Sequence, residues 1–441
     1  MYKGKIQNYY LFFSVMLLVL ALNFDYTGLS LITPLLMKQF NLGIMNIQWL
    51  TTAYFIAAGC FFIPGGWLAD KVGAHIPYLL GLIFFVIGAL LVSLSNSLEW
   101  LIVARVLQGL GFAFAFNTGI LLVKNAAQPN NQAFTVALMI MVASVTQALG
   151  PFFAGLIAEF SNWRFIFLLN VLIGAIALML FMATKNKDNK PASIETTQNL
   201  SLYQKFNKPF LFSCLMRIVF NLCWTSIIFL TPIYLQNILK MSVIESGFYM
   251  LAMGAVAGLL SPVVGHWVDK INALTFIMLA LIVLVGGNII YVSYANYYSY
   301  LYLCLLYGVG IACMLPALTK FAMQSISKTH EGKGMGFFYT CSLLSSALSA
   351  PLVSSLLYYY GLVQATKIIP HQPFIQETVI QYASGSTAIN KLPPGFSVAE
   401  SVIKNIFVGS LQTILLWQCA IMVLFILPLC FKRVRRKLER N

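Results

Sequence analysis

Long apolar runs separated by short polar segments dominate this chain. A membrane-spanning helix needs about 20 mostly apolar residues at about 1.5 Å each. Runs of that kind fall at 9–31, 46–69, 76–96, 98–123, 133–158, 163–184, 209–231, 243–266, 272–294, 299–323, 333–357 and 404–430. The pattern predicts an all-α integral membrane protein with twelve transmembrane helices. The first run contains Asn23 and Asp25 and has no clear small-residue cleavage site, so we expect a span there, with a signal peptide as the weaker alternative.

Two polar segments organise the predicted helices. The basic stretch 185–208 divides them six and six and indicates a cytoplasmic linker between an N-terminal six-helix bundle, 1–184, and a C-terminal bundle, 209–441. The segment 358–403 carries four prolines and is too polar to span. We expect it to form a long outer loop, either as an ordered cap or as a tolerated insertion.

The lysines and arginines indicate an orientation for these helices. Of the 27, nineteen fall on the side that holds both termini, six fall on the opposite side, and Arg105 and Arg217 lie within helices. Positive residues are enriched in cytoplasmic segments. We therefore expect both termini in the cytoplasm and a multi-pass location in a bacterial inner membrane.

Composition narrows the function classes. The net charge of +15 does not indicate nucleic-acid binding, because only 9% of the residues are charged and they are scattered between apolar runs. The 8 cysteines fall inside the apolar runs without metal-ligand spacing, so we expect neither a metal nor another cofactor. No phosphate-binding loop with the spacing of nucleotide-driven pumps is present in the sequence.

Landmarks in the first half of the chain recur in the second half at an offset of 198 to 200 residues. The recurring pairs are Thr33-Pro34 and Thr231-Pro232, Gly66 and Gly265, Asp70-Lys71 and Asp269-Lys270, Gly109 and Gly308, Gly111 and Gly310, and Pro151 and Pro351. A nearly constant offset predicts two pseudo-symmetric six-helix bundles related in parallel, with a substrate path between them.

Several motifs resemble the major facilitator superfamily of secondary transporters. They are the glycine-rich loop 65–73, the Asp-Tyr-Thr run at 25–27, the Arg-Val-Leu-Gln-Gly run at 105–109, the Gly-Pro pair with a later glycine at 150–155, and the aromatic run 163–170. Within that superfamily they are most similar to drug:proton antiporters, in the subgroup that usually has fourteen helices. The resemblance implies a transporter rather than an enzyme. The family usually has a basic pair after the glycine-rich loop, whereas this chain has Ala74-His75, which implies a less strongly held inner gate.

Asp25 is the one acid that we place well within a predicted span. By the rise of a helix it lies about 24 Å from the inner face, and Arg105 lies about 10 Å from the outer face, so the two depths agree. Burying either charge alone is costly, which favours a hydrogen-bonded pair between helices 1 and 4. We expect Asp25 to carry the transported proton and Arg105 to oppose its uptake; a fixed structural ion pair is the alternative. The offset places Cys223 and Cys304 at the matching positions of the second half, so proton handling is expected in the first half.

Three further groups of residues are candidates for the transport cycle. The resemblance implies a gate around Asp70 that stabilises the outward-open state through helix 11. Lys124, at the inner end of helix 4, is a candidate partner, and a purely topological role for Asp70 and Lys71 is the alternative. The gate candidates are Gly66, Asp70, Lys71, Gly73, Lys124, Gly265, Asp269 and Lys270. Hinge candidates, which combine a missing backbone donor with close-packing glycines, are Gly150, Pro151, Gly155 and Pro351. Polar and aromatic candidates for the substrate cavity are Tyr54, Gln108, Asn117, Arg217, Asn221, Trp224, Trp417 and Gln418. Arg217 is expected either to extend toward lipid phosphates or to contact an anionic substrate.

These observations favour a monomeric, proton-coupled antiporter that exports small amphipathic molecules across the lipid bilayer by alternating access. Proton-driven uptake of a metabolite or siderophore-like chelator is a second possibility, kept open by Arg217 and the altered glycine-rich loop. A non-transporting membrane receptor or assembly partner that uses the outer loop is a third, against which the recurring landmarks of both halves argue.

Overall fold

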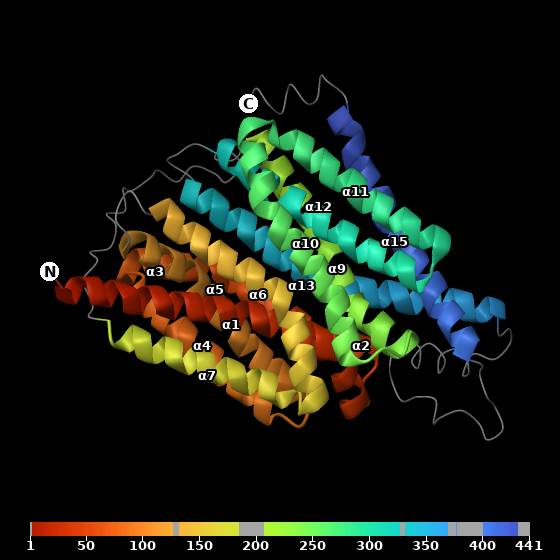
Figure 1. Cartoon of the computed structure of the whole chain (residues 1–441), viewed down its shortest axis with the longest axis horizontal. Helices are drawn as coiled ribbons and strands as arrows, with labels where there is room; N and C mark the ends of the chain where they lie inside the picture. The colour runs from red at the N-terminus through yellow and green to blue at the C-terminus, as the bar shows by residue number, and fades with distance from the viewer. Residues whose placement is uncertain are drawn as a thin grey trace.

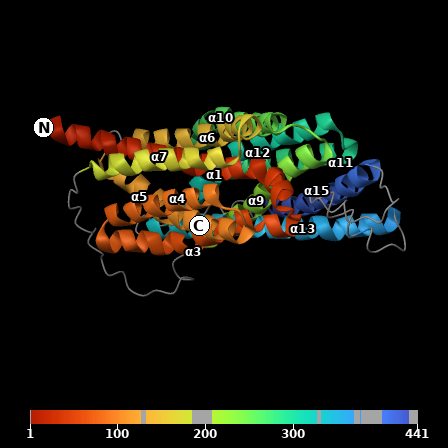
Figure 2. The same ribbon diagram turned by 90° about the horizontal axis from the view of Figure 1, so that it is seen from below.

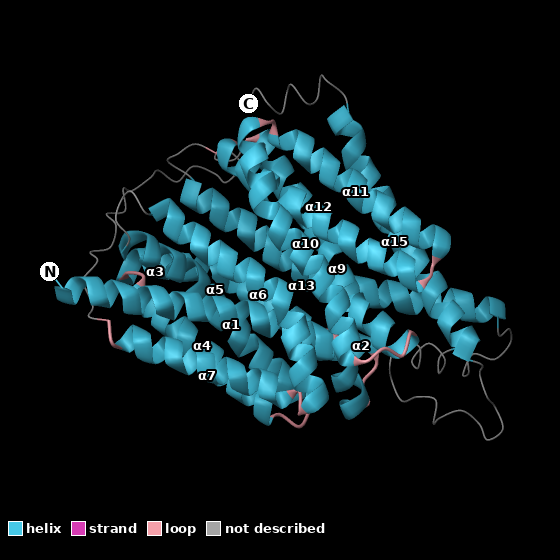
Figure 3. Ribbon diagram, viewed as in Figure 1, coloured by secondary structure: helices cyan, strands magenta, loops and turns pink. Residues whose placement is uncertain are grey.

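The structure is a computed structural model that describes residues 2–126, 132–184, 207–326, 331–368, 376 and 400–430. These residues form helices and no strand (Figure 3). Twelve of their helices are long and apolar enough to cross a membrane. The predicted linker 185–208 lies outside the described residues except for its last two positions, and so does most of the predicted outer loop 358–403.

The helices form two sets of six spans that lie side by side, coloured red to yellow and green to blue in Figure 1. They run nearly parallel to the long axis of the molecule (Figure 2). The N-terminal half contains α1 Tyr2–Phe40, α2 Ile44–Ile47, α3 Trp49–Val72, α4 His75–Leu94, α5 Leu98–Ala126, α6 Gln132–Phe160 and α7 Arg164–Met182. The C-terminal half contains α9 Lys208–Pro232, its π-helical continuation η2 Ile233–Ile238, α10 Val243–Lys270, α11 Ala273–Tyr294, α12 Tyr297–Gln324, α13 Glu331–Ile368 and α15 Glu400–Cys430.

Polar side chains fix where several helices of the C-terminal half begin. The Asn207 side chain accepts a hydrogen bond from the backbone of Phe210 at the start of α9. Ser242 and Glu245 form a reciprocal capping box at the start of α10, and Asn296 and Ser299 form another at the start of α12. Such caps satisfy backbone N–H groups that have no partner inside the helix.

Several helices extend beyond their predicted ends, α1 and α13 the furthest. The first was expected to end at residue 31, but α1 continues through Pro34 to Phe40. This proline removes the helical hydrogen bond to the Ser30 carbonyl, and the helix continues past it, as membrane helices often do. Side chains donate to the carbonyls on either side, from Thr33 to Leu29 at 3.0 Å and from Gln236 to Leu31 at 2.8 Å. The eleventh span was expected to end at residue 357, but α13 continues to Ile368 because this end packs on α15, where Ala365 is fully buried. The start of the predicted outer loop is therefore helical.

The two halves repeat the same packing at the offset seen in the sequence. A Cβ atom at Gly109 would lie 2.3 Å from the carbonyl oxygen of Tyr54, and one at Gly308 would lie 2.5 Å from that of Met253. Each contact joins the second and fourth spans of its own half. Glycine permits this close approach of helix backbones. This repeated geometry confirms the predicted pseudo-symmetric pair of six-helix bundles.

The halves meet along two helix pairs, α6 with α10 and α3 with α13, and α1 also contacts α9. A Cβ atom at Gly254 of α10 would lie 2.5 Å from Cα of Ala148 in α6, and one at Gly59 of α3 would lie 2.7 Å from the Leu344 side chain in α13. Small residues thus permit close contact between the two halves.

Candidate functional site

A polar cluster surrounds Asp25 in the middle of the N-terminal half. Its carboxylate accepts hydrogen bonds from Nη1 of Arg105 at 2.5 Å, Nε2 of Gln108 at 2.8 Å and Nδ2 of Asn170 at 3.2 Å. The donors come from α5 and α7, so the cluster ties three helices of one half together. Asp25 is 0% exposed and Arg105 is 1% exposed, which places the charged pair away from solvent.

The arginine is held from several sides. Its Nε donates to the Leu50 carbonyl at 3.2 Å, its Nη1 also donates to Oε1 of Gln108 at 2.6 Å, and its guanidinium lies 4.4 Å from the centre of the Tyr54 ring. Within the described residues, two buried atoms of the cluster lack a hydrogen-bond partner, Nη2 of Arg105 and Oδ1 of Asn170. One is a donor and the other an acceptor, so the cluster keeps unused hydrogen-bonding capacity.

Asp25 and Arg105 form the one ion pair found in the described part of the chain. The structure thus brings together the two residues that the sequence predicted to lie at the same depth in the membrane. Opposite charges attract strongly in such a buried setting, so the pair ties the packing of α1 to that of α5.

The corresponding region of the C-terminal half is polar but uncharged. Cys223 and Cys304, at the positions that match Asp25 and Arg105, are both buried. Tyr307, which matches Gln108 at an offset of 199, donates to Asn288 at 3.1 Å or to Gln418 at 3.0 Å. The two halves share a scaffold, but among the residues that the structure describes the ion pair occurs in the N-terminal half alone.

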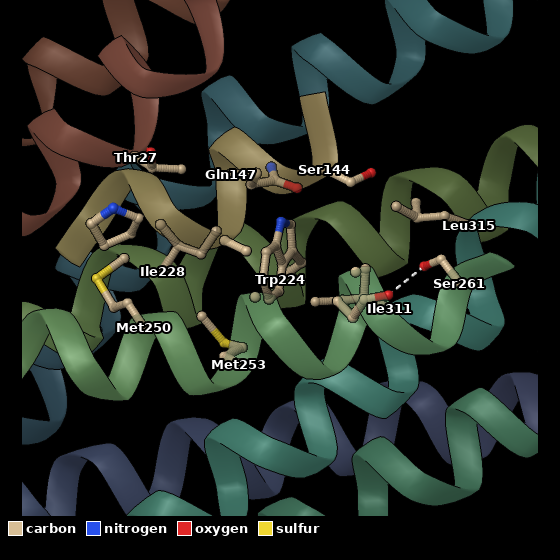
Figure 4. A pocket seen from close by; sticks show the side chains of 15 residues that line it. Thr27, Ser144, Gln147, Trp224, Ile228, Met250, Met253, Ser261, Ile311 and Leu315 are labelled. Carbon is tan, nitrogen blue, oxygen red and sulfur yellow. Dashed lines mark hydrogen bonds between the residues drawn. The ribbon is translucent and has the colours of Figure 1, made fainter. Parts of the chain in front are cut away.

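A cavity of about 50 Å³ lies between the halves, with side chains from α1, α6, α9, α10 and α12 around it (Figure 4). This volume has room for a few water molecules rather than for a drug-sized ligand. Its lining residues are Thr27, Ser144, Gln147, Ala148, Pro151, Trp224, Ile228, Met250, Met253, Gly254, Ala257, Gly258, Ser261, Ile311 and Leu315.

Of the eight predicted cavity residues, Trp224 lines this cavity. Tyr54 and Gln108 instead belong to the Asp25 cluster. Asn117 is half-buried on α5 and is not part of the lining. Gln418 faces the interior of the C-terminal half, where it accepts a hydrogen bond from Tyr307.

The three remaining candidates are not among the residues that line this cavity. Trp417 is 54% exposed on α15, and its indole N–H donates to the Tyr360 hydroxyl at 2.5 Å. Its placement in the cavity is wrong, because neighbouring positions of a helix face different directions and Gln418 takes the inward one. Arg217 and Asn221 both donate to Ser342 of α13, at 2.9 and 2.5 Å. The arginine therefore packs within its own half instead of reaching for lipid.

Among the gate candidates whose side chains the structure describes, none makes a hydrogen bond or ion pair with the opposite half. Asp70 is exposed, Lys71 lies 3.8 Å from the Trp67 ring centre on its own helix, and Lys270 is exposed. Gly73 ends α3 with a positive φ of 84°, a conformation that favours glycine. The side chains of Lys124 and Asp269 lie outside the described residues.

A Cβ atom at the gate candidates Gly66 or Gly265 would meet nothing within 4 Å. The tight backbone contact near this gate belongs to Gly65, where a Cβ atom would lie 3.0 Å from the Ala113 carbonyl oxygen.

The hinge candidates on α6 lie against both halves. A Cβ atom at Gly150 would lie 2.3 Å from Oγ1 of Thr27 in α1, and one at Gly155 would lie 3.2 Å from the carbonyl of Val243 in α10. Pro151 lies inside α6 and lines the cavity, whereas Pro351 lies inside α13 and is half-buried. The Gly150-Pro151 motif with Gly155 thus combines a missing backbone donor with close contact between the two halves.

The seam between the halves is closed at one end, which we call the closed end and which carries Phe40, Glu159 and Ile244. Hydrogen bonds cross it there from Ser30 to the Ile228 carbonyl at 2.8 Å, from Gln236 to the Leu31 carbonyl at 2.8 Å, from Thr52 to the Ala347 carbonyl at 3.2 Å, and from the Ile244 N–H to Glu159 at 3.0 Å. Ser30 and Ile228 are pseudo-equivalent positions at an offset of 198.

The opposite end, which carries Gly66, Gly265 and Gly336, is the open end. A Cβ atom at any of these glycines, or at Gly258, would meet nothing within 4 Å. The two halves therefore make close contact near the closed end and give these positions free space near the other.

The sequence did not single out Asn170, Glu159 or Gln147. Asn170 ends the aromatic run 163–170, and its place seven residues into a helix that packs on α1 was the available signal. Glu159 and Gln147 carry no local signal, because their roles depend on how α6 meets the other half.

Comparison with known proteins decides the family. The sequence model of the Major Facilitator Superfamily matches residues 14–350 of this chain. The chain belongs to this superfamily. It is therefore a multi-pass membrane transporter and not an enzyme.

Its relatives include transporters and resistance proteins. The riboflavin transporter RibZ of Clostridioides difficile is 25% identical over 75% of this chain and 84% of its own length. The multidrug resistance protein Stp of Mycobacterium tuberculosis is 24% identical over 74% of this chain and 71% of its own length. The lincomycin resistance protein LmrB of Bacillus subtilis is 23% identical over 76% of this chain and 82% of its own length.

Solved transporter structures share the fold. A bacterial homologue of the human lysosomal transporter Spinster, in an inward-facing and unoccupied conformation, superposes with a TM-score of 0.79 at 14% identity, covering 98% of both chains. A D-xylose–proton symporter superposes with a TM-score of 0.67 at 13% identity, covering 89% of this chain and 99% of the other.

Proposed function

We propose that this superfamily member is a proton-coupled antiporter that exports amphipathic small molecules. The observation that carries the proposal is the buried Asp25–Arg105 pair, which lies within the N-terminal half. Ionisable groups inside a membrane are costly and mark ion pathways and proton relays. The names of the relatives Stp and LmrB, a multidrug and a lincomycin resistance protein, support export of small molecules.

Coupling would run through α1. Asp25 and Ser30 are five residues apart on this helix, about 7.5 Å along its axis. Ser30 donates across the seam to Ile228, so one rigid helix carries both the titratable group and a contact that must break when the closed end opens. In this conformation three donors satisfy the carboxylate. The proton would bind in the alternate conformation, after those donors have moved.

The proposed cycle moves two bodies, 1–184 and 209–441, around a site between them. We infer that both termini are cytoplasmic in a bacterial inner membrane and that the open end faces the cytoplasm. Cysteines placed singly in segment 358–403, in a variant without native cysteines, should react with an impermeant reagent added outside intact cells. Reaction only after the inner face is exposed would overturn this orientation.

Proton flux in reconstituted vesicles tests the function. With an imposed pH gradient and a panel of amphipathic compounds, antiport predicts that compound leaves the compartment that protons enter. Asp25→Asn should abolish gradient-driven accumulation but leave counterflow exchange, because exchange needs no net proton movement. Glu99→Gln, the same chemical change at an exposed acid of α5, is the control and should keep both activities. Gradient-driven accumulation by Asp25→Asn would contradict the proposal.

Proton-driven uptake of a metabolite is the second candidate. The name of its relative RibZ, a riboflavin transporter, favours a metabolite as cargo. Movement of compound and protons in the same direction in the same vesicles would establish symport and exclude antiport.

A further inference from the structure

The cavity between the halves is lined by side chains that pack well against a flat aromatic ring. The Trp224 side chain extends between α6, which carries Gln147, and α10, which carries Met250 and Met253 (Figure 4). Indole faces and thioethers both pack favourably on aromatic rings. A planar ligand would therefore find an aromatic surface and two polarisable side chains in the same cavity.

The polar groups of this lining that remain available are few and close to the indole. In the described part of the chain, the Trp224 N–H, the Gln147 amide and the Ser144 hydroxyl make no hydrogen bond, whereas the Thr27 and Ser261 hydroxyls donate to carbonyls of their own helices. A ring nitrogen or carbonyl accepts from an N–H, and the amide can also accept from a ring N–H. These atoms suit the edge of a heteroaromatic ring better than a hydrocarbon.

The lining holds no charged side chain among its fifteen residues. The nearest acid along α1 is Asp25, two residues before Thr27, and its fully buried carboxylate already accepts three hydrogen bonds. A buried cation without a counter-charge loses more hydration than one cation–π contact returns. The site therefore disfavours cations.

The present volume of about 50 Å³ is too small for such a ring, so the site must widen. Met250 and Met253 form one wall, and methionine side chains adapt readily because they are unbranched and flexible. The lining also extends through Gly258 toward the open end, where the two halves leave free space. Widening thus needs rotation of these side chains and separation of α6 from α10, which pack closely at Ala148 and Gly254 in this conformation.

We propose that this cavity binds an uncharged, planar heteroaromatic ring, stacked on Trp224 and hydrogen-bonded by Gln147. The inference rests on the proposed function and deepens it by naming a substrate class. Within the broad class of amphipathic molecules, the proposed site selects by charge as well as by size.

Equilibrium binding to the purified full-length protein in detergent tests this proposal without any proton gradient. The probes are acridine, at a pH where it is neutral, and 10-methylacridinium, which has nearly the same shape but a fixed positive charge and a blocked ring nitrogen. Fluorescence titration should give acridine a Kd at least about tenfold lower than that of 10-methylacridinium. Equal or tighter binding of the cation would overturn the proposal.

Variants then locate the site. Trp224→Ala should raise the Kd of acridine about tenfold, and Trp224→Phe, which keeps a flat ring, less than about threefold. Trp417→Ala, the same truncation at the exposed tryptophan of α15, is the matched control and should leave the Kd unchanged. If Trp224→Ala does not fold, Gln147→Leu, which keeps the side-chain volume, should still raise the Kd at least about threefold. An unchanged acridine Kd in a folded Trp224→Ala or Gln147→Leu protein would overturn the assignment.

The outcomes separate this inference from the proposed function. Acridine binding that depends on Trp224, in a protein that moves no protons with any compound, would contradict antiport and leave the site standing. Proton-coupled export of other compounds, with acridine binding indifferent to Trp224, would overturn the site and leave antiport standing.

Discussion

Replacing Asp25 by asparagine tests whether the buried pair is charged in this conformation. The aspartate offers two acceptor oxygens, one to Gln108 and Asn170 and the other to Arg105. An asparagine offers one oxygen and one NH₂ group, so whichever way the amide points, its NH₂ faces a donor. Gln108 is poorly placed to relieve this by turning its own amide, because its Oε1 already accepts from Arg105.

The larger cost comes from the arginine. Arg105 is 1% exposed, so Asp25→Asn leaves a cation buried without its counter-charge. Removing one partner of a buried pair costs about 3–5 kcal/mol, much of it from the uncompensated charge. In the double variant Asp25→Asn/Arg105→Gln the charge itself is gone, and we expect about 2 kcal/mol of that loss to return.

Unfolding of the purified proteins in detergent, followed by heat or by denaturant, measures both effects. The expected order of stability is wild type, then the double variant, then Asp25→Asn. Glu99→Gln is the control at an exposed position and should change stability by well under 1 kcal/mol. If Asp25→Asn were as stable as Glu99→Gln, or if the double variant were less stable than Asp25→Asn, the pair would not be the buried charged contact described above.

Two further predictions concern the seam and the packing within one half. Glu159→Ala removes the acceptor and the negative charge at the first turn of α10, which should shift the equilibrium toward opening of the closed end about two- to fivefold. Glu159→Gln keeps the acceptor and should shift it less. The labelling rate of a single cysteine at Ser30, in a variant without native cysteines, reports this opening. Equal rates in the wild-type, Glu159→Ala and Glu159→Gln backgrounds would contradict a role for the Ile244–Glu159 hydrogen bond in holding the closed end shut. Gly109→Ala should destabilise the protein by about 1–3 kcal/mol because its Cβ would lie 2.3 Å from a backbone oxygen of α3. Gly66→Ala, with free space around the new methyl group, should be neutral or slightly stabilising in the same thermal assay, and a reversed order would refute the packing argument.

The sequence was sufficient where one strong physical constraint acted alone. Hydrophobic runs predicted twelve spans because a bilayer leaves few alternatives to the helix. The depths of Asp25 and Arg105 predicted that they would meet, since an isolated charge in a membrane is so unfavourable. The constant offset predicted the repeated packing later seen at Gly109 and Gly308.

The sequence was insufficient where the result depended on the direction of a side chain or on contacts between helices that are distant along the chain. Trp417 and Gln418 are neighbours in the sequence, yet one faces outward and the other faces Tyr307. Composition cannot separate them without the helix phase relative to its neighbours. Asn170 was missed for the same reason, because an asparagine in an apolar helix carries no sign of which partner it bonds.

Infrared difference spectroscopy of the carboxyl groups during substrate-driven turnover tests the central claim most directly. A protonated carboxylic acid absorbs apart from a carboxylate, so uptake and release of H⁺ at one residue can be followed and assigned by mutation. We predict a protonated-acid band that rises and falls with turnover, is absent from Asp25→Asn and is retained in Glu99→Gln. A band that persists in Asp25→Asn, or a spectrum in which Asp25 keeps a single charge state throughout turnover, would contradict proton coupling at this site.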